Sequence, residues 1–177
     1  IAGGGIAGLT AAIALSRTDV RITVFEQSST LSEIGAGLQL SPNATRILDR
    51  LDVLRRLTPV ASMPKGIAIV RARDLARLAT VPLGTGAVAR WGAPYLTVHR
   101  ADLQSALLAT AGHCANVEIV TGATARDAAL HAQGVTLSVD HGGAIDEVRC
   151  DLAIGADGVW STLRGLGGGE RLSRFTG

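Results

Sequence analysis

The strongest constraint on the fold is a glycine-rich turn near the start of the chain. Residues 3–8 satisfy the pattern G-x-G-x-x-G, and an Ala- and Leu-rich stretch, residues 6–17, follows directly. Ala and Leu favour helix, whereas the β-branched residues of the next segment, 20–26, favour a strand. A short apolar segment, a tight turn, a helix and a strand form a βαβ unit, whose strands lie parallel in one sheet. We therefore predict an α/β fold built on a parallel sheet.

Each glycine of such a turn has a separate task when the turn binds a dinucleotide. Gly3 permits the tight turn, Gly5 lets a pyrophosphate approach the backbone, and Gly8 lets the helix pack close to the sheet. The helix N-terminus presents free N–H groups to the anion. At the end of the next strand, Glu26 is placed to accept hydrogen bonds from both hydroxyls of an adenosine ribose, and it would repel a 2′-phosphate. The pattern predicts a dinucleotide site; the alternative is a turn that only packs a helix on a sheet, with Glu26 solvated.

The composition excludes several other classes of protein. Hydrophobic residues make up 47% and charged residues 18% of the 177 positions, which rules out a disordered chain and fits one ordinary domain. The net charge is +2 and the basic residues are scattered, so neither nucleic acid nor an anionic membrane surface is a predicted partner. No apolar run reaches the roughly 18 residues of a membrane span. Cys114 and Cys150 form no C-x-x-C pair, so we expect reduced thiols in a cytoplasmic protein and no metal site.

The two ends of the sequence indicate a piece of a longer protein. Only Ile1 and Ala2 precede the glycine turn, although a buried strand usually has about five residues. The last stretch, residues 165–177, carries no helix or strand pattern. We therefore expect the chain to be incomplete.

The rest of the chain alternates short strand and helix patterns. Ser41 and Pro42 are typical of a helix start, with a hydroxyl at the N-cap and proline in the first turn. An apolar stripe at helical spacing follows, formed by Ile47, Leu48, Leu51, Leu54 and Leu57. The other expected elements are a loop over 27–40, two strands outside the parallel sheet at about 66–82, a strand over 95–99, a helix over 101–112, a buried strand over 117–122, a meander over 123–150 and a final strand over 151–158.

Three separated motifs resemble a known family. The segment CDLAIGADGVWSTLR, residues 150–164, resembles the second signature of the FAD-dependent aromatic hydroxylases, the single-component flavoprotein monooxygenases. The residues at the positions of that signature are Asp151, Asp157, Gly158, Ser161 and Arg164. Residues 33–51 are similar to the loop and helix that follow the ribose-binding strand in this family, and residues 98–108 to its Arg-containing junction of strand and helix. The resemblance covers residues 1 to about 165 and is closest to the salicylate and 3-hydroxybenzoate hydroxylase-like branch; ubiquinone-pathway hydroxylases share the motifs.

The resemblance implies a glutathione-reductase-like, FAD-binding Rossmann fold with a parallel sheet and a β-meander crossover. Residues 1–165 would form the FAD-binding domain, and the small strands at about 66–82 would belong to the substrate region. Residues 166–177 would be the truncated beginning of a substrate domain whose sheet is largely missing. The third FAD signature of the family, Gly-Asp followed by small residues and His, is absent from the sequence. The catalytic base is therefore expected to lie outside this chain.

The resemblance also implies roles for particular residues. Arg100 would reach the FAD pyrophosphate from the start of a helix, with Gln104 one turn along, and Asp157 would lie near the ribityl chain and pyrophosphate. Residues 35–39 would lie close to the flavin ring. The alternatives are a surface Arg100, a plain surface loop at 35–39 and an Asp157 that only caps the next helix. The full set of expected cofactor contacts is Gly3, Gly5, Ala7, Gly8, Glu26, Gln27, Gly37, Arg100, Gln104 and Asp157.

The activity that the resemblance implies is hydroxylation of a phenolic or aromatic carboxylate substrate, with FAD as cofactor, NAD(P)H as reductant and O₂ as second substrate. The chain alone is expected to be inactive. An NAD-dependent dehydrogenase would explain residues 3–26 but neither of the later motifs, and a truncated, non-catalytic FAD-binding remnant is the third alternative. The choice between NADH and NADPH, the particular substrate and the oligomeric state stay open.

Overall fold

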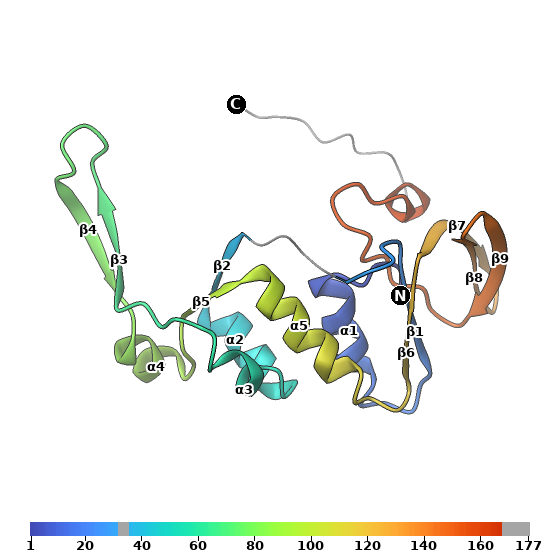
Figure 1. Ribbon diagram of the computed structural model, residues 1–177, viewed down its shortest axis with the longest axis horizontal. Helices are drawn as coiled ribbons and strands as arrows, with labels where there is room; N and C mark the ends of the chain where they lie inside the picture. Colours follow the sequence, from blue (N-terminus) through green and yellow to red (C-terminus); the bar gives the residue numbers. More distant parts are fainter. Residues whose placement is uncertain (32–35, 168–177) are drawn as a thin grey trace. The chain divides into compact units, whose positions relative to one another are not determined.

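The computed structural model of the protein describes residues 1–31 and 36–167 (Figure 1). The chain forms two compact units. The first unit consists of residues 1–32 and 111–177, and the second unit of residues 33–110.

A parallel sheet forms the base of the first unit. Its two main strands, β1 (Ile22–Glu26) and β6 (Val117–Thr121), pair in parallel along their whole length. Ala2, next in the sheet, bridges β1 on one side and Gly155 on the other, both in parallel. The order across the sheet is therefore β6, β1, the start of the chain and the segment around Gly155. This arrangement confirms the predicted parallel sheet.

The helix that follows the glycine turn, α1 (Ile6–Leu15), packs on this sheet. Ala12 of the helix lies in a buried cluster with Ile22 and Val24 of β1. Partly buried apolar side chains complete the cluster: Ile1, Leu15, Val117 and Ile119. These contacts hold the N-terminus of α1 at the carboxyl edge of the sheet, where the glycine turn lies.

An antiparallel meander connects β6 to the segment around Gly155. Its strands β7 (Ala123–His131), β8 (Gly134–His141) and β9 (Ala144–Cys150) pair in sequence order (Figure 1). The meander packs on the parallel sheet through a cluster that includes the buried residues Ala123, Leu137 and Val139 and the partly buried Phe25 and Val120. The β-meander crossover expected from the resemblance is therefore confirmed.

The second unit combines a small sheet, a hairpin and helices. β2 (Gly37–Leu40) pairs antiparallel with β5 (Leu96–His99). β3 (Gly66–Val70) and β4 (Arg77–Pro82) form a separate antiparallel hairpin in which every residue is exposed. These are the two strands predicted outside the parallel sheet. The helices are α2 (Pro42–Arg50), α3 (Leu54–Leu57), α4 (Thr85–Trp91) and α5 (Arg100–Ala111).

Three expectations for the middle of the chain need correction. The stretch 27–40, expected to be a loop throughout, ends in β2, because β5 supplies backbone partners from far along the sequence. The single helical stripe is divided between α2 and α3, since Asp52 has a φ of 61° between them, and Ile47 of the stripe is 51% exposed. No expected element corresponds to α4, whose sequence contains Gly86, a residue that disfavours helix.

Two finer predictions also differ from the structure. Ser41 is the N-cap residue of α2, as predicted, but its hydroxyl donates to the side chain of Asn43 and does not cap the helix. Its backbone carbonyl accepts the N–H of Ala44 at 2.9 Å instead. The final strand expected over 151–158 is reduced to a single bridge at Gly155, because only its centre lies beside the start of the chain.

Candidate functional site

The first glycine of the turn lies against the peptide that joins Ala156 and Asp157. Gly3 has a φ of 104°, in the left-handed region that favours glycine. A Cβ on Gly3 would lie 2.3 Å from the carbonyl oxygen of Ala156. Ala156 also donates its N–H to the carbonyl of Ala2 at 2.7 Å. No residue with a side chain fits at position 3, so the tight turn requires this glycine.

The other two glycines of the motif differ in their surroundings. A Cβ on Gly8 would lie 1.8 Å from the carbonyl oxygen of Gly3. The backbone of the helix therefore packs directly against the backbone of the turn. Among the described residues, and leaving out its two chain neighbours, no atom lies within 4 Å of a Cβ on Gly5, and the φ of −75° at this position is open to any residue. The space over Gly5 is therefore free, which is the property that a phosphate-binding turn needs. Gly5 is also the N-cap residue of α1. Because glycine has no side chain, it makes no side-chain cap to the N–H groups of the first helical turn.

Glu26 ends β1 and reaches back to the glycine turn. Its Oε2 accepts the N–H of Gly4 at 2.7 Å, and its Oε1 accepts the N–H of Ser28 at 2.8 Å. A carboxylate offers about four acceptor sites, so, counting the partners among the described residues, sites on both oxygens remain for a ligand. The sequence predicted Glu26 but not its two donors. Gly4 is the middle glycine of the run Gly3-Gly4-Gly5, but no sequence pattern marks its N–H or that of Ser28 as a donor.

Two further predicted residues flank this group. Ala7 lies in the first turn of α1 and Gln27 follows Glu26, and both are exposed. The first unit therefore brings together the predicted residues Gly3, Gly5, Ala7, Gly8, Glu26 and Gln27 at the carboxyl edge of the parallel sheet.

Asp157 is engaged within its own loop. Its Oδ2 accepts the N–H groups of Thr162 and Leu163 at 2.8 and 3.1 Å. Burial raises the pKa of Asp157, but hydrogen bonds from Ser161, Leu163 and Thr162 outweigh it, so the pKa lies below its usual value. Asp157 therefore does cap the start of the next helix, the role that the sequence left as the alternative to cofactor binding. A role in cofactor binding stays a prediction, supported by the contact of its backbone with Gly3.

Gly158, Ser161 and Arg164 of the second signature stabilise the same loop. Arg164, in the 3₁₀ helix η1 (Leu163–Gly167), donates through Nη2 to the carbonyls of Gly158 and Val159, each at 3.2 Å. The N–H of Arg164 donates to Oγ of Ser161 at 3.0 Å. Gly158 has a φ of 81°, which explains why glycine stands there.

Three predicted contacts, Gly37, Arg100 and Gln104, belong to the second unit. Gly37 begins β2 and Arg100 begins α5, and the N–H of Arg100 donates to the carbonyl of Ala36 at 3.1 Å. In the part of the chain that the structure describes, no atom other than those of its chain neighbours lies within 4 Å of a Cβ on Gly37. Gln104, one turn along α5, is only 5% exposed. Gly35, which we expected close to the flavin, lies outside the described residues.

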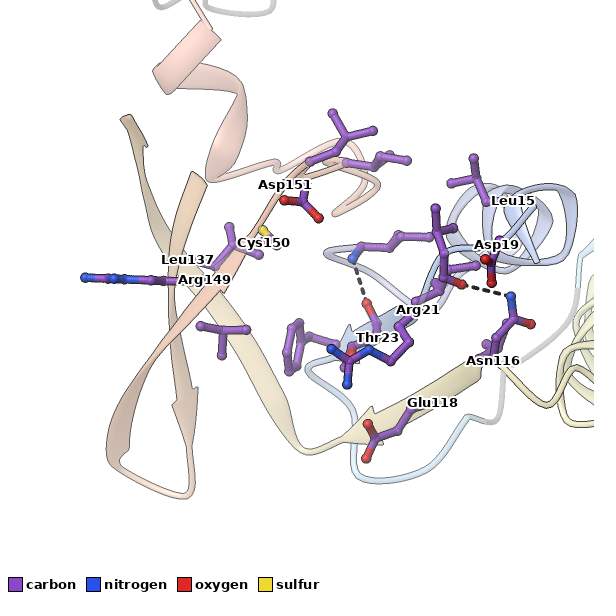
Figure 2. Close-up of a pocket in the computed structure, with 18 of the residues that line it drawn as sticks. Leu15, Asp19, Arg21, Thr23, Asn116, Glu118, Leu137, Arg149, Cys150 and Asp151 are labelled. Carbon is purple, nitrogen blue, oxygen red and sulfur yellow. Dashed lines mark hydrogen bonds between the residues drawn. The ribbon is translucent and has the colours of Figure 1, made fainter. Parts of the chain in front are cut away.

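A cavity of about 730 Å³ lies at the opposite edge of the parallel sheet (Figure 2). Its lining includes Arg21 and Thr23 near the start of β1 and Cys150 at the end of β9. The amino group of Ile1 donates to the carbonyl of Thr23 here at 2.7 Å. The cavity faces the amino ends of the parallel strands and the glycine turn faces their carboxyl ends, so they are separate features.

Within residues 1–31 and 36–167, no group of three or more His, Cys, Asp or Glu side chains could hold a metal ion. In that same part of the chain, none of the helices is long and apolar enough to cross a membrane.

A family model described as FAD binding domain matches residues 1–173 of the chain. A 3-amino-4-hydroxybenzoate 2-monooxygenase of Streptomyces platensis is 40% identical over 182 residues, which cover 100% of this chain and 43% of that protein. A 3-hydroxybenzoate 6-hydroxylase of Polaromonas naphthalenivorans is 36% identical over 164 residues, which cover 93% of this chain and 40% of that protein. The chain therefore spans about two fifths of the length of these curated relatives.

Solved structures share the fold. The tetrameric form of 2-methyl-3-hydroxypyridine-5-carboxylic acid oxygenase matches with a TM-score of 0.76 at 30% identity, covering 92% of this chain and 39% of that one. The flavin-dependent monooxygenase PieE, in complex with FAD and substrate, matches with a TM-score of 0.77 at 22% identity, covering 90% of this chain and 30% of that one. The second likeness, at its lower identity, concerns the fold alone.

Proposed function

The chain belongs to the family of FAD-binding domains, and on that premise we propose that the carboxyl edge of its parallel sheet binds the ADP half of FAD. The observation that carries this proposal is the contrast among the three glycines of the turn. A Cβ would strike backbone atoms at Gly3 and at Gly8, but it would meet open space at Gly5. A turn that only packed a helix on a sheet would not need a glycine at position 5.

Each part of the ADP half has a partner in the first unit. The pyrophosphate would lie over Gly5, where the N-terminus of α1 offers its N–H groups and the positive end of its dipole. The free acceptor sites of Glu26 would take hydrogen bonds from the adenosine ribose hydroxyls. The exposed residues Ala7 and Gln27 would flank the nucleotide. The resemblance adds four further proposed contacts with FAD, namely Gly37, Arg100, Gln104 and Asp157.

We further propose that the whole protein hydroxylates a phenolic or aromatic carboxylate substrate. The two curated relatives, of Streptomyces platensis and Polaromonas naphthalenivorans, are named for hydroxybenzoates, which supports this substrate class. Bound FAD would supply the redox chemistry, taking electrons from NAD(P)H and passing them to O₂. The residues of this chain would bind and orient the cofactor. We also propose a cytoplasmic location, in which the thiols of Cys114 and Cys150 would stay reduced.

The other functions considered from the sequence gain no support. The relatives reported above are monooxygenases, hydroxylases or oxygenases, and none is a dehydrogenase. None is named for a ubiquinone precursor or for a non-catalytic role. The aromatic hydroxylase proposal is therefore the one that the relatives favour.

The cofactor site is tested by titrating the chain with FAD and following flavin fluorescence. Gly5→Val would fill the space proposed for the pyrophosphate, and the backbone at Gly5 accepts valine without strain. We expect a folded variant that binds no FAD. Gly86→Val is the matched control, because Gly86 also faces open space and belongs to the second unit. A folded Gly5→Val variant that keeps the wild-type affinity would contradict the proposed site.

The proposed reaction is tested on protein that contains this chain together with the further length present in its relatives. With FAD bound, 3-hydroxybenzoate should accelerate the oxidation of NADH or NADPH and should be recovered as a dihydroxylated product. If no phenol accelerates the oxidation of NADH or NADPH, and peroxide is its only product, the proposed reaction is contradicted. This result would not contradict the proposed FAD site.

A further inference from the structure

The carboxylate of Glu26 is held by two backbone donors of the chain itself. Its Oε2 accepts the N–H of Gly4 at 2.7 Å, and its Oε1 accepts the N–H of Ser28 at 2.8 Å. Each carboxylate oxygen has about two acceptor sites, so each keeps about one site free. Since one bond is made by each oxygen, the two bonds together fix both the position and the rotation of the carboxylate.

Gly4 is enclosed by the side chain that it binds. A Cβ on Gly4 would lie 3.0 Å from the Cβ of Glu26, 3.2 Å from its Oε2 and 3.2 Å from Cδ2 of Leu31. Gly4 is buried, and a buried backbone N–H needs an acceptor. The glycine motif leaves this position variable, yet here both the N–H of Gly4 and its lack of a side chain serve Glu26.

Ser28, the second donor, is anchored to the neighbouring strand. Its carbonyl accepts the N–H of Gly122 at 3.0 Å, directly after the end of β6. Gly122 has a φ of 69°, a turn conformation that favours glycine. Glu26 is therefore held from the glycine turn by one bond and, through Ser28, from the carboxyl end of β6 by the other.

We propose that Gly4 and Ser28 are positioning residues for the nucleotide: their N–H groups orient Glu26 so that its free acceptor sites receive the two hydroxyls of the adenosine ribose. This inference rests on the proposed function. It adds a structural reason why the proposed site would select a ribose that carries both hydroxyls. A carboxylate that is already oriented loses little further freedom when the ribose binds, which favours affinity. The two donors also require an acid at position 26, because an amide would turn its NH₂ group toward one of the two N–H groups.

A purely structural role for the two bonds makes a different prediction. If the bonds only stabilised the turn, their loss would lower the affinity of the site for every ligand by the same factor. If they orient Glu26, their loss reduces the preference for a nucleotide with a 2′-hydroxyl over one without it. The ratio of two dissociation constants therefore separates the two roles.

The test uses the full chain and two ligands, FAD and an FAD analogue built on 2′-deoxyadenosine, both titrated by flavin fluorescence. Ser28→Pro removes the N–H of residue 28, and the conservative variant Ser28→Ala restores it. Gly4→Val places a branched side chain against the carboxylate, whereas Gly4→Ala adds a methyl group to which Glu26 and Leu31 must yield by a few tenths of an ångström. Circular dichroism identifies the variants that fold, and either Ser28→Pro or Gly4→Val is sufficient to decide.

The wild-type chain should prefer FAD to the deoxy analogue by roughly tenfold. Ser28→Pro and Gly4→Val should reduce this preference to about twofold or less, and Ser28→Ala should recover it. An unchanged preference in a folded Ser28→Pro or Gly4→Val variant would overturn the inference while leaving the FAD site in place. A wild-type chain that binds no FAD would overturn the proposed function, and this inference with it.

Discussion

The N–H of Gly4 donates to Oε2 of Glu26 at 2.7 Å, which ties the acid at the end of β1 to the middle of the glycine turn. The turn and the acid are separate motifs in the sequence, 22 residues apart, but one hydrogen-bonded structure in the fold. A change at Glu26 must therefore affect the stability of the chain as well as its affinity for a nucleotide.

Glu26→Ala should weaken FAD binding more than Glu26→Gln. Alanine removes every acceptor at this position, whereas glutamine keeps one oxygen. A lost hydrogen bond to a charged group costs roughly 1.5–3 kcal/mol, which is about tenfold or more in Kd. Both variants should also lower the free energy of unfolding, by about 1 kcal/mol for each backbone bond lost. Fluorescence titration and urea unfolding measure the two effects, and equal FAD affinity in wild type and Glu26→Ala would refute the ribose assignment.

Gly8→Ala should destabilise the chain, and Gly5→Ala should not. A Cβ on Gly8 would lie 1.8 Å from the carbonyl oxygen of Gly3, so the helix and the turn would have to separate. Overpacking of this kind typically costs about 1–3 kcal/mol. Gly5 faces open space and serves as the control. The urea midpoints of the two variants provide the comparison, and similar midpoints would show that the turn is not packed as described.

The stabilising effect of Asp157 should depend on pH. In the folded chain its pKa is lowered: burial acts in the opposite direction, but hydrogen bonds from Ser161, Leu163 and Thr162 outweigh it. A lowered pKa means that the stabilisation is present above the unfolded value of about 3.9 and is lost as the pH falls through the folded value. Asp157→Asn should thus be less stable than wild type near neutral pH, and the difference should shrink below about pH 4. Urea unfolding across this range gives the result; a difference independent of pH would count against it.

The sequence was sufficient to predict those elements that depend on residues close together in the chain. The glycine turn, α1 and β1 follow from residues 3–26, and the meander follows from alternating apolar residues with glycine at its turns. β2 was missed because its four residues carry no strand pattern of their own and depend on β5 for partners. The break between α2 and α3 was missed because the apolar spacing continues across Asp52, where the backbone turns.

At the candidate site the sequence revealed side chains but not backbone donors. Glu26 and Asp157 were predicted from their positions in motifs. Their partners are backbone N–H groups, which every residue except proline possesses, so the sequence cannot distinguish Gly4 or Ser28 as a donor. The second signature was expected to contact the cofactor, and the structure adds that Arg164 also holds its own loop together.

The place of the cofactor is tested most directly by following the backbone amide signals of the isotopically labelled chain during a titration with FAD. We expect the largest changes at Gly4, Gly5 and Gly8, at the carboxyl edge of the parallel sheet. We expect small changes at Ile22 and Val117, which line the cavity at the opposite edge. The largest changes at Ile22 and Val117, with none in the glycine turn, would contradict it.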